Sequence, residues 1–281
     1  MRRTSRFLLP LVALLGLIGA ACGDDSSATT ATPATTAAAT TAAGTAGAVP
    51  TTTVAKATGN ITVLAAASLT DSFKELGTKF EAANPGAKVT FSFAASSALV
   101  AQITQGAPAD VFASADAANM KKLTDAGANA GDPVNFATNK LQIIVAKGNP
   151  KGIATLADLA KPGVIYVTAA PEVPIGAYGK QALAAANVTV TPKSLEADVK
   201  SIVNKVALGE ADAGIVYATD VLAAGEKATG ISIPDPQNVI ASYPIAVIKA
   251  ATNANAAAAF VKFVASADGQ TVLAKYGFTK P

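Results

Sequence analysis

The sequence of 281 residues contains no histidine and only one cysteine. The chain therefore cannot build the usual nitrogen and sulfur site for zinc, a haem centre, a Ser-His-Asp or Cys-His catalytic group, or a disulfide within itself. The glycine-rich patterns GxGxxG and GxxxxGKS/T, which bind dinucleotides and nucleoside triphosphates, are also absent. These absences exclude most familiar enzyme chemistry, and we expect no cofactor.

Arginine is almost as rare, because the chain has only Arg2, Arg3 and Arg6. From residue 22 onward, 19 lysines stand against 19 acidic residues, so that part of the chain is neutral. The formal net charge of +3 therefore comes from the first six residues. Nucleic-acid binding needs a clustered basic footprint that replaces the counterions of the phosphate backbone. We therefore expect no nucleic-acid partner.

The first 21 residues are typical of a secretion signal, with three arginines, an apolar run at residues 7–18 and small residues at 19–21. Cys22 follows at once. This arrangement resembles a bacterial lipoprotein signal, in which the cysteine after the cleavage point is acylated. The resemblance implies a protein held by lipid on Cys22, and by nothing else, at the extracytoplasmic face of the cell membrane. An ordinary cleaved signal is the alternative, while about 12 apolar residues are too few for a bilayer core that needs about 20.

Residues 26–58 have a biased composition, since 24 of these 33 residues are alanine or threonine. Their apolar residues show no periodicity, and such a segment cannot form a core. We predict that residues 22–58 comprise the anchor cysteine and a disordered linker. The folded body then begins at residue 59.

The body is interpreted as an α/β protein, because short apolar strands alternate with amphipathic helical segments. The predicted strands occupy residues 61–66, 88–93, 110–113, 141–146, 164–167, 213–217 and 245–248. The predicted helices occupy residues 71–83, 98–105, 117–126, 177–186, 199–208 and 256–265. This alternation indicates open, mostly parallel sheets with helices on both faces.

Two long strand candidates, residues 140–147 and 242–249, are spaced so that each can carry the chain between two lobes. We therefore predict two hinge crossings. One lobe then combines residues 59–139 with 250–281, and the other consists of residues 140–249 with the hinge strands. One large domain is the alternative, because a body of this length fits either arrangement.

Small and polar residues fill the turns after the predicted strands. Ser68 follows the first strand, Ser96 follows the second, and Asp198 is placed to cap the helix at 199–208. In open α/β sheets, ligands bind beyond the carboxyl ends of the strands, where helix N-termini offer free N–H groups. A lone serine at such a turn is more often only a helix cap. Considered alone, Ser68 and Ser96 are therefore each interpreted as helix caps and not as ligand-binding residues.

Six segments together resemble the molybdate-binding protein of ABC transporters in their order and spacing. They are AAASLT (65–70), FAASS (93–97), GAPADVFASAD (106–116), VPIG (173–176), GIVY (214–217) and YGF (276–278). The resemblance covers essentially all of residues 59–281. It implies a two-lobed periplasmic-binding-protein fold that closes on a tetrahedral oxyanion and delivers it to a membrane permease.

The resemblance also implies which residues bind the ligand. Ser68 and Ser96 match family serines that donate hydroxyl and backbone N–H groups from the first lobe. Ile175 and Val199 match positions that donate backbone N–H groups from the second lobe. Tyr217 matches the tyrosine whose hydroxyl completes the cage.

Two departures from the family pattern lie in the loop before residue 176. The chain has Ala170-Pro171 where the family often has Asp-Pro, and Ile175 is bulkier than the usual small residue. These differences concern the shape of the loop more than the backbone donor.

A site of this kind needs no lysine or arginine, because hydrogen bonds to a charged group, of about 1.5 to 3 kcal/mol each, offset the lost hydration of a dianion. A site with donors alone also rejects hydrogen phosphate, whose O–H finds no acceptor. We expect a monomer that binds molybdate, and tungstate as well, and passes it to a permease with its cytoplasmic ATPase.

Three alternatives stay open at this point. The first is a binding protein for sulfate or another tetrahedral oxyanion. The second is a surface enzyme, which we do not expect, because the available side chains show no pairing of a base with a nucleophile. The third is a purely structural lipoprotein, which would retain no oxyanion.

Overall fold

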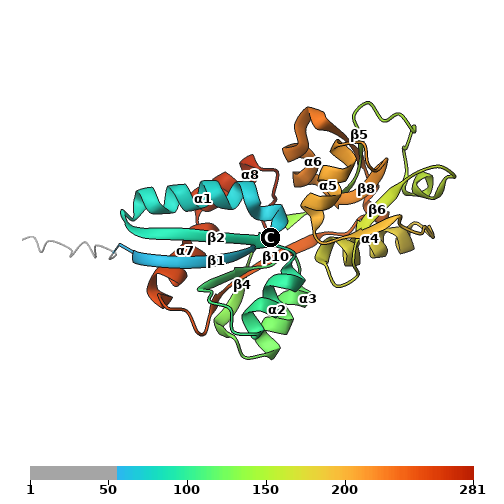
Figure 1. Ribbon diagram of the computed structural model, residues 1–281. Coiled ribbons are helices and arrows are strands. Elements are labelled where there is room, and N and C mark those ends of the chain that lie inside the picture. Colours follow the sequence, from blue (N-terminus) through green and yellow to red (C-terminus); the bar gives the residue numbers. More distant parts are fainter. Residues whose placement is uncertain (1–55) are drawn as a thin grey trace, which may run out of the picture. The chain divides into compact units, whose positions relative to one another are not determined.

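Two five-stranded sheets organise residues 56–281, which the computed structural model describes (Figure 1). These residues lie within one compact unit. The predicted secretion signal at residues 1–21, the anchor Cys22 and the linker up to residue 55 lie outside the described residues. No helix within residues 56–281 is both long enough and apolar enough to span a membrane.

The first sheet has two parallel and two antiparallel strand pairs. In spatial order its strands are β2 (Gly86–Ala94), β1 (Thr58–Ala66), β3 (Val111–Ala113), β10 (Ala241–Ile248) and β4 (Asn129–Asn139). β1 runs parallel to β2 and β3, whereas β10 runs antiparallel to β3 and β4. The carboxyl ends of β1, β2 and β3 therefore lie at one edge of the sheet.

The second sheet repeats this plan. In spatial order its strands are β7 (Ser194–Glu196), β6 (Tyr166–Ala169), β8 (Ala213–Tyr217), β5 (Leu141–Ala146) and β9 (Ala228–Ser232). β6 runs parallel to β7 and β8, whereas β5 runs antiparallel to β8 and β9. The predicted α/β class is confirmed, with more antiparallel pairs than the alternating pattern indicates.

Helices cover both sheets, and we call each sheet with its helices a lobe. The helices of the first lobe are α1 (Thr70–Ala83), α2 (Ser96–Thr104), α3 (Ala117–Asp125), α7 (Ala254–Ala265) and α8 (Ala267–Lys275). Those of the second lobe are α4 (Pro174–Ala185), α5 (Val199–Ala207) and α6 (Ala218–Ala224). Short 3-10 helices are η1 (Ala67–Leu69), η2 (Leu156–Ala160), η3 (Gly225–Lys227) and η4 (Asp235–Gln237).

Alternation of side chains along β1 explains why the first sheet is covered on both faces. Val63 and neighbouring apolar residues join the cluster in which Phe73 of α1 and Phe260 of α7 pack edge to face, with ring centroids 6.2 Å apart. Leu64 points the other way and joins a second cluster with α2 and α3. Figure 1 shows α1 on one side of this sheet and α2 and α3 on the other.

The chain passes between the two sheets twice. The first crossing is at Lys140, since β4 ends in the first sheet and β5 starts in the second. The return lies at residues 233–240, between β9 and β10. Asn238 joins the two crossings, because its Oδ1 accepts the N–H of Leu141 at 2.9 Å and its Nδ2 donates to the carbonyl of Leu141 at 3.0 Å. The crossings are thereby held side by side.

Residues 242–249 lie differently from the prediction. They fall largely in β10, which pairs with β3 and β4 in the first sheet, and not in a hinge strand of the second lobe. An apolar strand pattern reports burial but not the sheet that the strand joins. The division of the chain at residues 139/140 and 249/250 stays a prediction. The structure also contains β4, β7, β9, α6 and α8, which the alternating pattern does not indicate.

Gly176 lies in the first turn of α4, close against the end of β6. A Cβ atom at this position would collide with the carbonyl oxygens of Ala169 and Ala170, which cannot move without shifting the strand end. We predict that Gly176→Ala lowers the free energy of unfolding by about 1–3 kcal/mol, because overpacking forces the backbone to shift. Chemical denaturation measures this change.

Gly179→Ala on the same helix is the matched control. A Cβ atom there would lie 3.7 Å from the side chain of Ile215, an ordinary contact. Alanine in a helix interior also gains up to about 1 kcal/mol over glycine. Equal stabilities of the two variants would contradict this account of Gly176.

Candidate functional site

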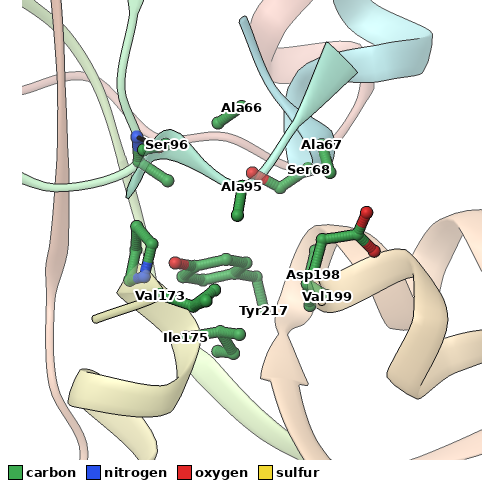
Figure 2. A pocket seen from close by; sticks show the side chains of 12 residues that line it. Ala66, Ala67, Ser68, Ala95, Ser96, Val173, Ile175, Asp198, Val199 and Tyr217 are labelled. Carbon is green, nitrogen blue, oxygen red and sulfur yellow. Dashed lines mark hydrogen bonds between the residues drawn. The ribbon is translucent and has the colours of Figure 1, made fainter. Parts of the chain in front are cut away.

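A cavity lies where the carboxyl ends of β1, β2 and β3 face the start of α4, the start of α5 and the end of β8 (Figure 2). About 210 Å³ of space without protein atoms lies here, part of it open to solvent. Half of its lining comes from each lobe: Ala66, Ala67, Ser68, Ala95, Ser96 and Ala115 from the first, and Val173, Pro174, Ile175, Asp198, Val199 and Tyr217 from the second.

The structure brings all five predicted ligand-binding residues together in this cavity. They are Ser68, Ser96, Ile175, Val199 and Tyr217. In Figure 2 the ring of Tyr217 lies between Ser68 and Ala95 on one side and Val173 and Ile175 on the other. Their role as hydrogen-bond donors to a ligand stays a prediction.

Ser68 lies in the turn that follows β1. The small side chains of Ala66 and Ala67 leave room at this strand end, and the chain passes through η1 into α1. Ser68 is buried, and its Oγ lies 3.1 Å from the hydroxyl of Tyr243 on β10. The N-cap residue of α1 is Leu69, so Ser68 is not a helix cap.

Ser96 is the first residue of α2 and is buried. Its Oγ accepts the N–H of Ala115 at 3.0 Å, from the turn that follows β3. The N-cap position belongs to Ala95, which has no side chain that caps. The helix-cap interpretation is therefore wrong for both serines.

Two helices of the second lobe begin at the cavity. Ile175 is in the first turn of α4, after Pro174, and Val199 is the first residue of α5. An α-helix offers no internal acceptor to the N–H groups of its first turn, and its N-terminus carries a partial positive charge. These two N–H groups therefore suit an anion.

Tyr217 ends β8 and is 1% exposed. Its hydroxyl has no hydrogen-bond partner among residues 56–281. Burial, together with nearby tyrosine and aspartate side chains, raises the pKa of Tyr217 well above its usual range, so the hydroxyl keeps its proton. A buried donor without an acceptor costs free energy unless a ligand accepts from it.

The lining carries no basic side chain in the part of the chain that the structure describes. Asp198 is the acidic residue of the lining, and it is the predicted N-cap of α5. Its Oδ1 accepts the N–H of Ser201 at 2.9 Å and the Ser201 hydroxyl at 3.0 Å. Figure 2 shows its carboxylate directed away from Tyr217. Within residues 56–281, no group of three or more acidic, histidine or cysteine side chains is arranged to hold a metal ion.

Lys200, next to Val199, joins the two lobes, a feature that the sequence pattern does not predict. Its Nζ lies 3.4 Å from Oδ2 of Asp71 on α1 and 3.6 Å from Oδ1 of Asp220 on α6. Asp220 accepts the N–H of Tyr217 at 3.3 Å. Asp220 lies in the first turn of α6, three residues after Tyr217, where acidic residues are common; the sequence could have indicated this position. No comparable signal connects Lys200 with Asp71, because the two lie far apart in the sequence.

A second contact joins the lobes on another side of the cavity. Nδ2 of Asn119 on α3 donates to the carbonyl of Glu172, in the loop before α4, at 3.4 Å. The same amide group also donates to Oδ2 of Asp116, the N-cap of α3, at 2.9 Å. The lobes are therefore in direct polar contact around the cavity.

A cavity between two lobes, lined equally by residues of both, is typical of a protein that binds a small solute. The profile of the family described as bacterial extracellular solute-binding protein matches residues 61–279. The chain belongs to this family. Members are solute-binding proteins of transporters, so the chain is extracytoplasmic and is not an enzyme.

Similar proteins confirm the resemblance and the fold. The molybdate-binding protein ModA of Mycobacterium tuberculosis (strain ATCC 25618 / H37Rv) is 45% identical over 222 residues, which cover 79% of this chain and 85% of that protein. The periplasmic molybdate-binding protein of Azotobacter vinelandii superposes with a TM-score of 0.70 at 21% identity, covering 79% of this chain and 99% of that one. The sulfate-binding protein SubI of M. tuberculosis H37Rv superposes with a TM-score of 0.72 at 23% identity, covering 79% of this chain and 86% of that one. The two-lobed periplasmic-binding-protein fold is thus confirmed.

The buried carboxyl of Asp220, which contacts Lys200, makes the stability of the protein depend on pH. Burial raises its pKa from an ordinary 3.8 to about 6, although Lys200 opposes the shift. The folded protein then keeps a proton that the unfolded chain loses near pH 3.8. The contribution of this carboxyl to the free energy of unfolding therefore decreases as pH rises from about 4 to about 6, by at most about 3 kcal/mol.

We predict that Asp220→Asn removes this decrease. The stability of the parent relative to the variant should be higher at pH 4 than at pH 7, as measured by denaturation at a series of pH values. Asp125→Asn, at an exposed carboxyl of α3, is the control. If parent and Asp220→Asn respond to pH in the same way, Asp220 does not titrate as described.

Proposed function

We propose that this chain binds molybdate, and tungstate as well, in the cavity between its lobes, and delivers the oxyanion to the permease of an ABC importer. The observation that carries the proposal is the buried hydroxyl of Tyr217, which has no hydrogen-bond partner in the described part of the chain and lies in a cavity where two helices begin. A tetrahedral oxyanion supplies the acceptors that this arrangement requires. Ser68 and Ser96 add two hydroxyl donors from the opposite lobe.

Neutral donors are sufficient for a dianion when several converge. Each hydrogen bond to a charged group contributes about 1.5 to 3 kcal/mol, and enclosed donors act more strongly than donors in water. The helix N-termini at Ile175 and Val199 add the favourable end of the helix dipole. An anion site without lysine or arginine is therefore physically reasonable in a chain that has no net charge from residue 22 onward.

The choice of molybdate depends on sequence similarity, because the fold does not discriminate. The solved structures named for molybdate and for sulfate superpose almost equally well. The relative with 45% identity is a molybdate-binding protein, and that similarity favours molybdate. A binding protein for sulfate or another tetrahedral oxyanion is the alternative candidate.

The proposal extends to the partners and the place of the protein. The expected partners are a permease and its cytoplasmic ATPase, and the expected state is a monomer without a cofactor. Lipid on Cys22 would hold the chain at the extracytoplasmic face of the cell membrane, with the alanine- and threonine-rich linker letting the lobes reach the permease.

We predict that molybdate and tungstate raise the Tm of the purified protein, since a ligand that binds only the folded state stabilises it by mass action. At a concentration of about 100 times Kd the gain is about 2.7 kcal/mol. Sulfate and hydrogen phosphate should give much smaller shifts at equal concentration. A thermal melt with each anion, followed by calorimetric titration, provides the measurement. If sulfate raises the Tm as much as molybdate does, the molybdate assignment is wrong and the sulfate alternative takes its place.

We also predict that Cys22→Ser releases the protein from the membrane into the soluble fraction, because a thioether-linked lipid depends on that one thiol. Fractionation of cells that produce the parent and the variant gives the measurement. The released variant should bind molybdate as tightly as the parent. Retention of Cys22→Ser in the membrane would instead indicate an uncleaved leader.

A further inference from the structure

The two serines of the cavity are held from behind by hydrogen bonds, and in one case the direction of that bond is fixed. Oγ of Ser96 accepts the N–H of Ala115 at 3.0 Å. A backbone N–H can only donate. One lone pair of Ser96 is therefore occupied, and its own proton remains available to the cavity.

Ser68 is held differently, by a side chain. Its Oγ lies 3.1 Å from the hydroxyl of Tyr243, and either oxygen can be the donor. Tyr243 is fully buried in β10. Its ring packs against Tyr217 and Phe278, with centroid distances of 5.8 and 5.3 Å. The hydroxyl of Tyr243 is thus fixed in position behind Ser68 without reaching the cavity lining.

We infer that Tyr243 is a positioning residue that sets the specificity of the site, because its hydroxyl donates to Ser68 and turns the proton of Ser68 toward the bound anion. This inference rests on the proposed function. If Ser68 gives its single proton to the oxyanion, the only proton left for the bond between the two hydroxyls belongs to Tyr243.

Two acceptors lie next to the Tyr243 hydroxyl: Oγ of Ser68, and Oδ1 of Asn139, which is buried with no other hydrogen-bond partner among residues 56–281. Burial raises the pKa of Tyr243 far above its usual range, so the side chain remains a neutral hydroxyl. The site then faces the ligand with donors only from Ser68, Ser96 and Tyr217. Such a site binds a fully deprotonated oxyanion but leaves the O–H of hydrogen phosphate without an acceptor, which costs free energy.

Tyr243→Phe tests the inference because it removes one hydroxyl and keeps the ring. The hydroxyl of Ser68 becomes free to rotate and can accept a hydrogen bond from hydrogen phosphate. We expect the affinities for molybdate and sulfate, which carry no proton, to fall in similar proportion, by about 3- to 10-fold. The affinity for hydrogen phosphate, measured at mildly alkaline pH, should fall less or rise. Preference for molybdate over hydrogen phosphate therefore narrows.

A double-mutant cycle separates positioning from a general loss of packing. In a Ser68→Ala background, Tyr243→Phe should have no further effect on molybdate affinity, because the group that it orients is missing. Tyr166→Phe, at another buried tyrosine in the second sheet, is the matched control and should leave the anion preference unchanged. Denaturation curves of all variants confirm that they fold.

The outcomes are distinct. If the parent binds none of the oxyanions, the proposed function is wrong and the inference fails with it. If the parent binds molybdate but Tyr243→Phe weakens all three anions equally, or acts undiminished in the Ser68→Ala background, only the inference is overturned.

A direct measurement needs no variant. Neutron diffraction from crystals of the unaltered protein with molybdate, after exchange into D₂O, locates the hydroxyl deuterons. A deuteron on Tyr243 directed at Oγ of Ser68 is expected. A deuteron on Ser68 directed at Tyr243, or a deuteron on Tyr243 directed at Oδ1 of Asn139, would overturn the inference.

Discussion

The structure depends on one constraint, which is that a buried hydrogen-bond donor needs an acceptor. A donor left without one costs about 1–3 kcal/mol, and this cavity collects several. The hydroxyl of Tyr217 is buried and unpaired among residues 56–281, and the N–H groups of Ile175 and Val199 lie at helix starts that offer no internal acceptor. Donors from two lobes that meet around an empty volume favour an anion with acceptors on all sides.

The scaffold makes this meeting possible through its connections. Each lobe presents strand ends and helix starts at one edge of a sheet, and the two crossings bring these edges face to face. Asn238 holds the crossings together by two hydrogen bonds to Leu141. Lys200 then bridges the lobes through Asp71 and Asp220, directly beside the donor at Val199. The contacts that join the lobes therefore lie next to the groups that would hold the ligand.

Fold and specificity separate clearly in this protein. Solved structures named for molybdate and for sulfate share the fold to the same degree, so the arrangement of sheets and helices carries no preference between them. Preference between these two unprotonated anions must come from the size of the cavity, whereas the direction of its hydroxyl protons acts against hydrogen phosphate. Ser96 has that direction set by a backbone N–H, whereas Ser68 depends on the side chain of Tyr243. Buried polar side chains behind a site can thus decide what the site accepts.

The sequence alone determined the features that are local. Small residues after apolar strands predicted close approach at the turns with Ser68 and Ser96, and Asp198 predicted the start of α5, because strand ends and caps depend on neighbours in the chain. All five residues that the family resemblance indicated also lie in the lining of the cavity. Only the tertiary structure decided that β10 belongs to the first sheet, that Lys200 reaches Asp71, and that Tyr243 stands behind Ser68. Those relations join residues far apart in the chain, and hydrophobic pattern records burial without recording the partner.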